Sequence, residues 1–513
     1  MNKKEILEYC LKIGFQISPG VLDQVAKKEN PMNYLKNILE KINLYEKVPL
    51  VISTDTIESL NGKKNQEFPY IEPVTSKIEL KKPDLNSETN NVIHALNKDL
   101  PINVEILEDP TGKLLGTGKI EDFISYFRDR YEKLKIILRK QEYQNALTIN
   151  EAKNRVNEVV KIISIIRDLT KTNSGNYILE LEDYSGTISA RAYKNNEEIM
   201  KNMEHVMLDQ VLGITGIIKK SQENEILIIR EIAWPNVPLK RNIKTAEFPI
   251  FAALISDTHF GSKKFMKKQF QNFIDWLNGN TPDPKYKYFS ERIKYLIVAG
   301  DIVDGVGVYP SQQEDLEILD IKEQYNYAAE WFNKIPNHVH VIITPGSGHD
   351  AVRRALPHPA IPKKYAKSLY NLKNVIMLGN PAYFTLESVK FYVTHGDSFD
   401  DLIISIPHLS YEKSTESMVE MLRSRHIAPI YGLKTGIAPE REDHLVIKEV
   451  PDVFHTGHSH ILDINSYRNI LLINSGCFQD QTSYMKEKGI IPKPALVPII
   501  NLQTLELTVM NFN

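Results

Sequence analysis

Cysteine is scarce in this sequence: its 513 residues include only Cys10 and Cys477. Two cysteines cannot build a disulfide framework or a cysteine-based zinc site, and this scarcity is typical of a protein in a reducing compartment. Aromatic residues are also few, at 9%, whereas apolar residues make up 42% of the chain and charged residues 25%. This composition predicts a globular protein with a sizeable core and excludes a low-complexity scaffold.

Long hydrophobic runs and an excess of one charge are missing as well. No apolar run approaches the roughly 20 residues of a membrane span, and charged residues interrupt the start of the chain where a signal peptide needs an apolar core. Lys and Arg number 63 against 65 Asp and Glu, which gives a formal net charge of -2. Any contact with nucleic acid must therefore be local or shared with a partner. We expect a soluble, cytoplasmic protein without membrane contact.

The length predicts several domains, since one domain typically has about 100 to 200 residues. Residues 1–48 carry apolar side chains at helical intervals, broken by prolines, and predict a small helical domain. Residues 49–100 are rich in Lys, Asn, Glu, Ser and Pro and predict a flexible linker, because they cannot bury enough apolar area to offset ordering. Residues 101–150 predict a strand at 103–107 and an amphipathic helix at 120–139, which lead into the next domain.

Residues 151–245 predict a small β-barrel. Five short apolar-rich runs are separated by turn signals: 159–163, 177–181, 187–191, 211–216 and 226–229. Five strands at this spacing fit an OB-fold barrel. Such barrels often bind single strands by stacking bases on aromatic rings, for which Tyr177, Tyr184 and Tyr193 are candidates. Acidic and basic residues roughly balance here, so packing and partner contact is the alternative role that we favour.

Residues 246–513 predict a layered α/β domain, in which apolar runs alternate with helical segments. The runs are 251–255, 295–299, 339–343, 375–378, 391–393 and 471–473. Continuous apolar strands of this kind are buried on both faces of a sheet. Ligands in such folds bind at the carboxyl ends of the strands.

Aspartate and histidine residues follow the predicted strands in five short motifs. These are Asp257-Thr258-His259, Gly300-Asp301-Ile302-Val303-Asp304, Gly346-Ser347-Gly348-His349-Asp350, His395-Gly396-Asp397 and Gly457-His458-Ser459-His460. Each motif alone is more often a cap or a satisfied polar group, but five in succession point to a metal centre. Carboxylates mixed with imidazoles suit manganese, iron or zinc better than calcium or magnesium. One bridging carboxylate, for which Asp301 is the candidate, permits two-metal hydrolysis at a phosphoryl centre.

In this order the motifs resemble those of the calcineurin-like metallophosphoesterase superfamily. The surrounding sequence is similar to the small subunits of the archaeal family D DNA polymerases over roughly residues 100–513. The similarity is carried by residues 120–123, 126–131, 231–238, 305–310, 355–362, 377–381 and 395–401. It implies an OB-fold barrel packed on a calcineurin-like phosphoesterase domain (246–513). It also implies that this chain carries a proofreading 3′→5′ exonuclease and supports DNA synthesis by a separate large catalytic subunit.

The resemblance also implies the ligands, substrate and partners. One divalent ion would be held by Asp257, His259, Asp301 and His460, and a second by Asp301, His395 and His458. Manganese is the first choice for both, with iron, zinc and magnesium as alternatives. The substrate would be DNA with a single-stranded 3′ end. A sliding clamp is a further candidate partner, although no clear clamp-binding peptide is present.

Three further residues receive roles from the same resemblance. His349 would contact the scissile phosphate or protonate the leaving 3′ oxygen, which suits a side chain with a reference pKa of about 6.5. Asp304 would hold a metal-binding histidine in the required tautomer, and Asp350 would orient His349. For the two acids, a helix or turn cap is an equally good alternative.

The third motif departs from the family pattern. The family has Gly-Asn-His-Asp, in which the Asn carbonyl oxygen is a ligand of the second ion, whereas this chain has Gly346-Ser347-Gly348-His349-Asp350. Gly348 offers no side chain and the loop is one residue longer, so Ser347 or a water would have to substitute. We expect this loss to weaken the second ion's site rather than to abolish it.

Two functions of different class therefore compete. The first is a metal-dependent proofreading nuclease, and the second is a non-catalytic scaffold subunit with a weakened or inactive phosphoesterase site. A scaffold has no need for clustered Asp and His residues at strand ends, so their retention favours the nuclease. A free-standing phosphatase or nucleotidase would need neither the barrel nor the helical domain.

Overall fold

The computed structural model of the chain describes residues 101–513 except 222–223, 282–283 and 347, together with residues 16–17, 25–26, 28, 31, 34–35 and 51–52. The chain divides into two compact units, Met1–Glu79 and Leu80–Asn513. In the first unit, strands β1 (Gln16–Ile17) and β2 (Val51–Ile52) pair in parallel. Strand β1 lies within the predicted helical domain and β2 within the predicted linker, and the rest of that linker up to residue 100 and most of the predicted helical domain lie outside the described residues.

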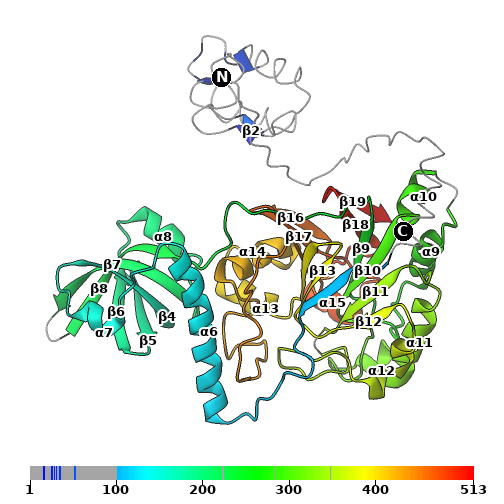
Figure 1. Cartoon of the computed structure of the whole chain (residues 1–513), viewed down its shortest axis with the longest axis horizontal. Coiled ribbons are helices and arrows are strands. Elements are labelled where there is room, and N and C mark those ends of the chain that lie inside the picture. The colour runs from blue at the N-terminus through cyan, green and yellow to red at the C-terminus, as the bar shows by residue number, and fades with distance from the viewer. Residues whose placement is uncertain are drawn as a thin grey trace. The chain divides into compact units, whose positions relative to one another are not determined.

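The second unit contains a closed five-stranded barrel, drawn in cyan to green in Figure 1. Its strands are β4 (Val159–Lys171), β5 (Tyr177–Asp183), β6 (Gly186–Ala192), β7 (Val211–Ser221) and β8 (Asn224–Ala233), paired in the order β4-β5-β6-β8-β7. Two short helices, α7 (Ile149–Lys153) and α8 (Glu197–Met203), pack against it. The five predicted strands are confirmed, and each is longer than the apolar run from which it was predicted.

Two six-stranded sheets form the α/β part. The first has the order β12-β11-β10-β9-β18-β19, with β9 (Phe251–Ile255), β10 (Ile293–Ala299), β11 (His340–Thr344), β12 (Val375–Met377), β18 (Leu496–Asn501) and β19 (Leu507–Asn511). The second has the order β16-β17-β15-β14-β13-β3, with β3 (Val104–Glu108), β13 (Ala382–Leu386), β14 (Val389–Val393), β15 (Val453–Thr456), β16 (Asp463–Tyr467) and β17 (Ile470–Asn474). Strands β9 to β12 run parallel to one another, which confirms the predicted α/β character.

The sheets face each other across a shared core and are covered by helices on their outer faces. In β9, Ala252 and Leu254 face the second sheet, while Ala253 and Ile255 pack under the helices. This alternation explains the continuous apolar runs, because both faces of each central strand are buried. The outer helices are α9 (Lys267–Leu277), α10 (Pro284–Ser290), α11 (Ile321–Phe332) and α12 (Lys363–Tyr370) on the first sheet, and α13 (Phe399–Ser405) and α14 (Ser414–Ser424) on the second. Short elements η1 (Gln312–Glu314), η2 (Tyr411–Lys413) and α15 (Ser483–Lys488) lie in the connections.

Helix α6 (Ile120–Lys140) joins the barrel to the α/β part. Acidic residues lie in its first turn and basic residues in its last, which suits the helix dipole. Tyr126 packs into the core of the second sheet's helices, whereas Leu134 and Leu138 pack toward the barrel. The sequence predicts residues 101–150 only as a lead-in, but β3 pairs with β13 and so belongs to the second sheet. Within the described part of the chain, no helix has the length and apolar character that crossing a membrane requires.

Candidate metal centre

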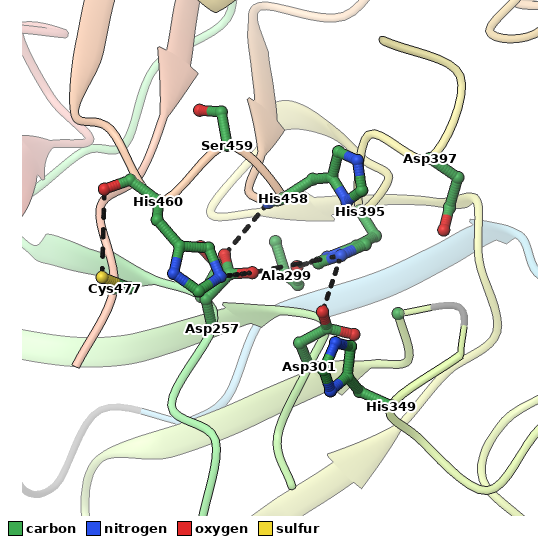
Figure 2. A network of polar contacts seen from close by, with 12 residues as sticks. Asp257, Ala299, Asp301, His349, His395, Asp397, His458, Ser459, His460 and Cys477 are labelled. Atoms are coloured by element: carbon green, nitrogen blue, oxygen red, sulfur yellow. Dashed lines mark hydrogen bonds and ion pairs between the residues drawn. The ribbon is translucent and has the colours of Figure 1, made fainter. Parts of the chain in front are cut away.

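Side chains from both sheets meet at the carboxyl ends of their central strands (Figure 2). Asp257 and His259 follow β9, Asp301 and Asp304 follow β10, and His349 follows β11. The second sheet contributes His395 after β14, and His458 and His460 after β15. We call these eight residues the strand-end centre.

The backbone at this centre is held in an unusual conformation. Five of the six predicted ligands have a positive φ: Asp257 (51°), His259 (49°), Asp301 (51°), His458 (73°) and His460 (58°). Non-glycine residues rarely adopt this left-handed region, and such outliers cluster where structure serves a function. The strain indicates that the surrounding fold enforces these side-chain positions.

The first group of potential ligands comprises Asp257, His259 and His460, whose ligand atoms lie within 4.8 Å of one another. His460 Nε2 is 3.3 Å and His259 Nε2 3.9 Å from Asp257 Oδ1, and the two imidazole nitrogens are 3.1 Å apart. All three side chains are buried. These atoms converge on one point, as ligands of a single cation do.

The second group comprises Asp257, Asp301 and His395. His395 Nδ1 lies 2.8 Å from the carbonyl oxygen of Ala299 and donates to it, which leaves Nε2 unprotonated in the neutral ring. His395 Nε2 lies 3.2 Å from Asp301 Oδ2 and 4.0 Å from Asp257 Oδ1. A backbone carbonyl that fixes the tautomer of a histidine in this way is typical of metal ligands.

Several of these buried atoms have no hydrogen-bond partner. Among the described residues, Asp257 Oδ1, Asp301 Oδ1 and His395 Nε2 lack one, although each lies close to other polar atoms. Buried polar groups are normally satisfied, so atoms that approach without hydrogen-bond geometry suggest a shared cation. Gly346 packs closely against Asp301, because a Cβ atom at position 346 would lie 2.1 Å from Asp301 Oδ1. The residues present therefore fit a pair of divalent metal ions.

The electrostatics of the centre favour a bound cation. Burial raises the pKa of Asp257, but His460 and His395 outweigh this effect and bring it to about 2. The pKa of Asp301 is likewise held well below its usual range, because His395 and His349 outweigh burial. Against the effect of burial, Asp301 and Asp257 raise the pKa of His395 well above its ordinary value. A proton on His395 thus provides the positive charge that a bound metal ion would otherwise provide. We therefore expect metal binding to release protons.

His349 and Asp304 form the third group of potential ligands, together with His259. His349 Nδ1 lies 2.6 Å from the backbone oxygen of Asp304, and His259 Nδ1 lies 3.0 Å from Asp304 Oδ1. Gln479 and Gln312 donate to the Asp304 carboxylate at 2.9 and 3.3 Å. Asp304 is therefore in contact with a predicted metal ligand, as its expected role requires.

Two predicted residues have partners other than those expected. Asp350 accepts hydrogen bonds from the backbone of Gly346 (3.0 Å) and Ile302 (3.3 Å) and from Tyr325 Oη (2.9 Å), and so braces the loops rather than the ring of His349. Burial and the neighbouring charge of Asp301 raise the pKa of Asp350 to about 7. This environment suits a carboxyl group that shares a proton, not one that orients an imidazole.

His458 lies at the edge of the centre and joins none of the three groups. Its backbone N–H donates to Asp257 Oδ2 at 3.0 Å, but its ring nitrogen Nε2 lies 3.7 Å from Asp400 Oδ1. Asp400 also accepts hydrogen bonds from Tyr411 and Lys434, and its pKa is lowered: burial raises it, but contacts with His458 and Lys434 outweigh burial. To join the second ion's ligands, the His458 ring must turn away from Asp400.

Sequence reasoning missed the residues that brace the centre, among them Asp400, Tyr325, Gln312 and Gln479. Asp400 was open to detection, because it lies shortly after His395 in a stretch with further aspartates. The others come from distant helices and loops, and no local pattern marks them. In the altered loop, Gly348 has a φ of +88°, and a Cβ atom at this position would contact only Val308, at 3.7 Å, while Ser347 lies outside the described residues.

Several known proteins that are similar to this chain share one name. A family model that describes the B subunits of DNA polymerases alpha and epsilon matches residues 252–461. A "DNA polymerase II small subunit" from Methanothermobacter thermautotrophicus is 40% identical and covers 79% of this chain and 82% of its own. Proteins of the same name from Archaeoglobus fulgidus (41% identity, 78% of this chain and 78% of its own) and Methanocaldococcus jannaschii (39%, 82% and 70%) are similar to the same extent. A solved structure, "OBody AM1L10 bound to hen egg-white lysozyme", resembles 16% of this chain and 80% of its own at a TM-score of 0.15 and 17% identity, which carries no argument.

Proposed function

This chain belongs to the family of the DNA polymerase II small subunits of archaeal family D DNA polymerases, and from that premise we propose that its strand-end centre is a metal-dependent 3′→5′ exonuclease. A small subunit of such a polymerase works beside a large catalytic subunit that synthesises DNA. A nuclease beside that synthesis would remove misincorporated 3′ nucleotides. The substrate class is accordingly DNA with a single-stranded 3′ end.

One observation carries the proposal: buried acids and imidazoles from both sheets converge at one edge with unsatisfied atoms. Asp257 Oδ1, Asp301 Oδ1 and His395 Nε2 have no hydrogen-bond partner among the described residues. A subunit that served only as a scaffold would gain stability by pairing or replacing these groups. A nuclease needs them for a cation.

Asp257, His259, Asp301 and His460 would hold one divalent ion, and Asp301, His395 and His458 a second, with manganese as the first choice. Bound there, the two ions would supply a hydroxide nucleophile and neutralise charge on the phosphoryl group. The chain's own residues fix the geometry. The Ala299 carbonyl orients His395, and the Asp304 carboxylate lies against the far side of the His259 ring.

His349 is the group that we assign to the leaving 3′ oxygen. Its Nδ1 donates to the backbone oxygen of Asp304, so its Nε2 is the nitrogen left to face the substrate. In its protonated form, Nε2 can donate a proton to the departing oxygen, and in either form the ring sits beside the scissile phosphate. His349 also lies within ligand distance of His259 and Asp304, so metal content must be measured whenever it is replaced.

The folds of both domains support this proposal. The barrel pairs its strands in the order β4-β5-β6-β8-β7 with a helix between its third and fourth strands, which suits an OB fold. The paired sheets with ligands at their carboxyl ends suit the calcineurin-like phosphoesterase fold. Of the candidate aromatics, Tyr184 donates to the backbone of Arg128 on α6, which supports a packing role over base stacking for this tyrosine.

The test compares two enzymes, each assembled with its large subunit. With manganese, the parent should degrade a 3′-ended single strand, and Asp301→Ala should lose this activity completely, because the variant lacks the acid expected to bridge both ions. Polymerisation should survive in both enzymes, whereas the purified chain alone should not extend a primer. Degradation by Asp301→Ala at near the parental rate would exclude the bridge.

The scaffold function remains the second candidate, and two features favour it. The His458 ring contacts Asp400, and Gly348 stands where the family has an Asn ligand. Both features concern the second ion's ligands. A parent enzyme that stays inactive at every manganese concentration, while still supporting polymerisation, would establish the scaffold and exclude the nuclease.

A further inference from the structure

A second set of metal-type ligands lies away from the strand-end centre. His205 follows helix α8 of the barrel, His408 follows α13, and Glu420 lies on α14 of the α/β part. Their ligand atoms lie within 4.8 Å of one another. We call this group the seam cluster, because its residues come from both sides of the contact between barrel and α/β part.

The geometry of the seam cluster resembles that of the strand-end centre. His205 Nδ1 lies 3.0 Å from Glu420 Oε1, yet among the described residues this nitrogen has no hydrogen-bond partner. The rings of His205 and His408 are 5.2 Å apart at 78°. Two ligand atoms of one tetrahedral ion lie about 3.3 Å apart when each is about 2.0 Å from the metal. The close approach without hydrogen-bond geometry therefore suits two ligands that share an ion.

The carboxylate of Glu420 is buried beside a guanidinium and an imidazole. Its side chain is only 3% exposed, and burial of a charged group is costly unless the charge is compensated. Arg423 Nε lies 3.2 Å from Oε2 without hydrogen-bond geometry, so this guanidinium occupies the side of the carboxylate away from His205. Oε1 is left for a ligand.

Packing holds the three residues in register. Glu420, Arg423 and Ser424 share one face of α14, and Gln210 Nε2 donates to Ser424 Oγ at 2.8 Å. Met207, between His205 and Gln210, packs into the same core as the methionines of α14. The segment that carries His205 is thus fixed to the helix that carries Glu420. A site on rigid elements binds a metal with little cost of ordering.

We propose that His205, His408 and Glu420 bind one zinc ion, which links the barrel to the α/β part. Two imidazoles and one carboxylate are a common zinc ligand set, and it leaves one tetrahedral position for water. The exposed side chain of His408 keeps that position accessible to solvent. The site stands independently of the proposed nuclease, because it shares no residue with the strand-end centre.

Anomalous diffraction at the zinc edge tests the site directly. Crystals of the full chain, freed of metal with a chelator and then soaked in zinc chloride, should give a peak between the two imidazoles and Glu420. His408→Ala should lose this peak and keep any peaks at the strand ends, since exposed His408 is not required for folding. The matched control His338→Ala should keep every peak. A zinc-soaked parent without density at the seam would overturn the proposal.

Solution measurements keep the proposal falsifiable without crystals. Zinc content after dialysis should fall by one ion per chain in His408→Ala and in Glu420→Gln, and stay unchanged in His338→Ala. In an Asp301→Asn background, which removes one acid of the strand-end centre, zinc should still raise the unfolding temperature, and addition of His408→Ala should reduce that rise. Equal zinc content and equal thermal shifts in all variants would show that the seam cluster is an ordinary ion pair.

Discussion

Two clusters of buried charge in this molecule differ in how fully their atoms are paired. Near the middle of α6, Arg130 forms with Asp443 and His426 what we call the α6 anchor, in which Asp443 Oδ2 lies 2.8 Å from both Arg130 Nε and His426 Nε2. Asp443 Oδ1 accepts from the backbone of Leu445, and Arg130 also donates to Tyr126 and to the Pro429 carbonyl. None of the three anchor side chains has a buried atom without a partner.

Six of the eight residues of the strand-end centre are buried, as the α6 anchor is, but several of their atoms are unpaired. It also holds Asp257, His259 and Asp301 with positive φ, whereas Arg130, Asp443 and His426 have no such strain. The contrast separates a cluster built for stability from one built for a ligand. Burial and charge are common to both, so neither identifies a functional site alone. The strand-end centre is distinguished from the α6 anchor by incomplete hydrogen bonding together with backbone strain.

The largest expected effect is a loss of catalytic rate that leaves metal binding unchanged. His349→Ala should lower the rate of 3′ degradation by about 10² to 10⁴-fold, the range associated with one general acid, because the ring meets the substrate and not the ion. Manganese content should stay at the parental level, measured by elemental analysis on the same preparations. Loss of bound metal in this variant would instead make His349 a ligand, as its proximity to His259 and Asp304 allows.

The next effect sets the two clusters directly against each other. Asp443→Asn should lower the free energy of unfolding by about 3 to 5 kcal/mol, because it leaves Arg130 buried without its countercharge. Manganese should still raise the unfolding temperature of this variant by the parental amount. Asp301→Asn should lose the manganese-dependent rise. The comparison fails if Asp443→Asn loses the manganese response, or if Asp301→Asn keeps it.

A smaller effect follows from the pH response of the α6 anchor. Burial and the charge of Arg130 lower the pKa of His426 to about 4, with Lys133 acting in the same direction and Asp443 against it. The unfolded chain takes up this proton near pH 6.5, so the stabilisation is fully present above about pH 6.5 and is lost as the pH falls toward 4. Urea unfolding between pH 7.5 and 5 should show a shallower loss for His426→Gln than for the parent. A parental slope in His426→Gln would contradict the assignment.

The smallest effect concerns the altered third motif. Replacement of Ser347-Gly348 by a single Asn restores the family spacing, and Asn tolerates the left-handed conformation that Gly348 adopts. We expect the manganese concentration for half-maximal exonuclease rate to fall, with little change in metal-free stability. Coincident manganese titrations for the two loops would show that the departure is neutral.

Elements of the fold that a single local sequence pattern determines could be predicted. The runs at 251–255 and 295–299 are buried on both faces, so their apolar continuity alone predicts β9 and β10. Strands β13, β15, β16, β18 and β19 were not predicted, although β13, β16 and β18 each pair with the next strand along the chain. Strand β3 was predicted, but its place in the second sheet was not, because its partner β13 lies more than 270 residues later. A strand's place in a sheet is a property of the whole fold.

The candidate site divides in a similar way. Asp257, Asp301 and His395 could be predicted because each follows a predicted apolar run, and parallel strands bring their carboxyl ends to one edge. His458 and His460 follow β15, which was not predicted, and were recognised from their motif. The side-chain partners could not be predicted: the His458 ring faces Asp400, and the Asp350 carboxylate accepts hydrogen bonds from backbone N–H groups. Those orientations depend on side chains from other elements, such as Tyr325 on α11.

The central claim is that the unpaired atoms of the strand-end centre exist to hold metal ions. Anomalous diffraction at the manganese edge, from crystals of the full chain soaked in manganese chloride, tests it most directly. We predict two peaks within ligand distance of Asp301, one shared with Asp257, His259 and His460 and the other with His395. The absence of any ion at these atoms under saturating manganese would contradict the account.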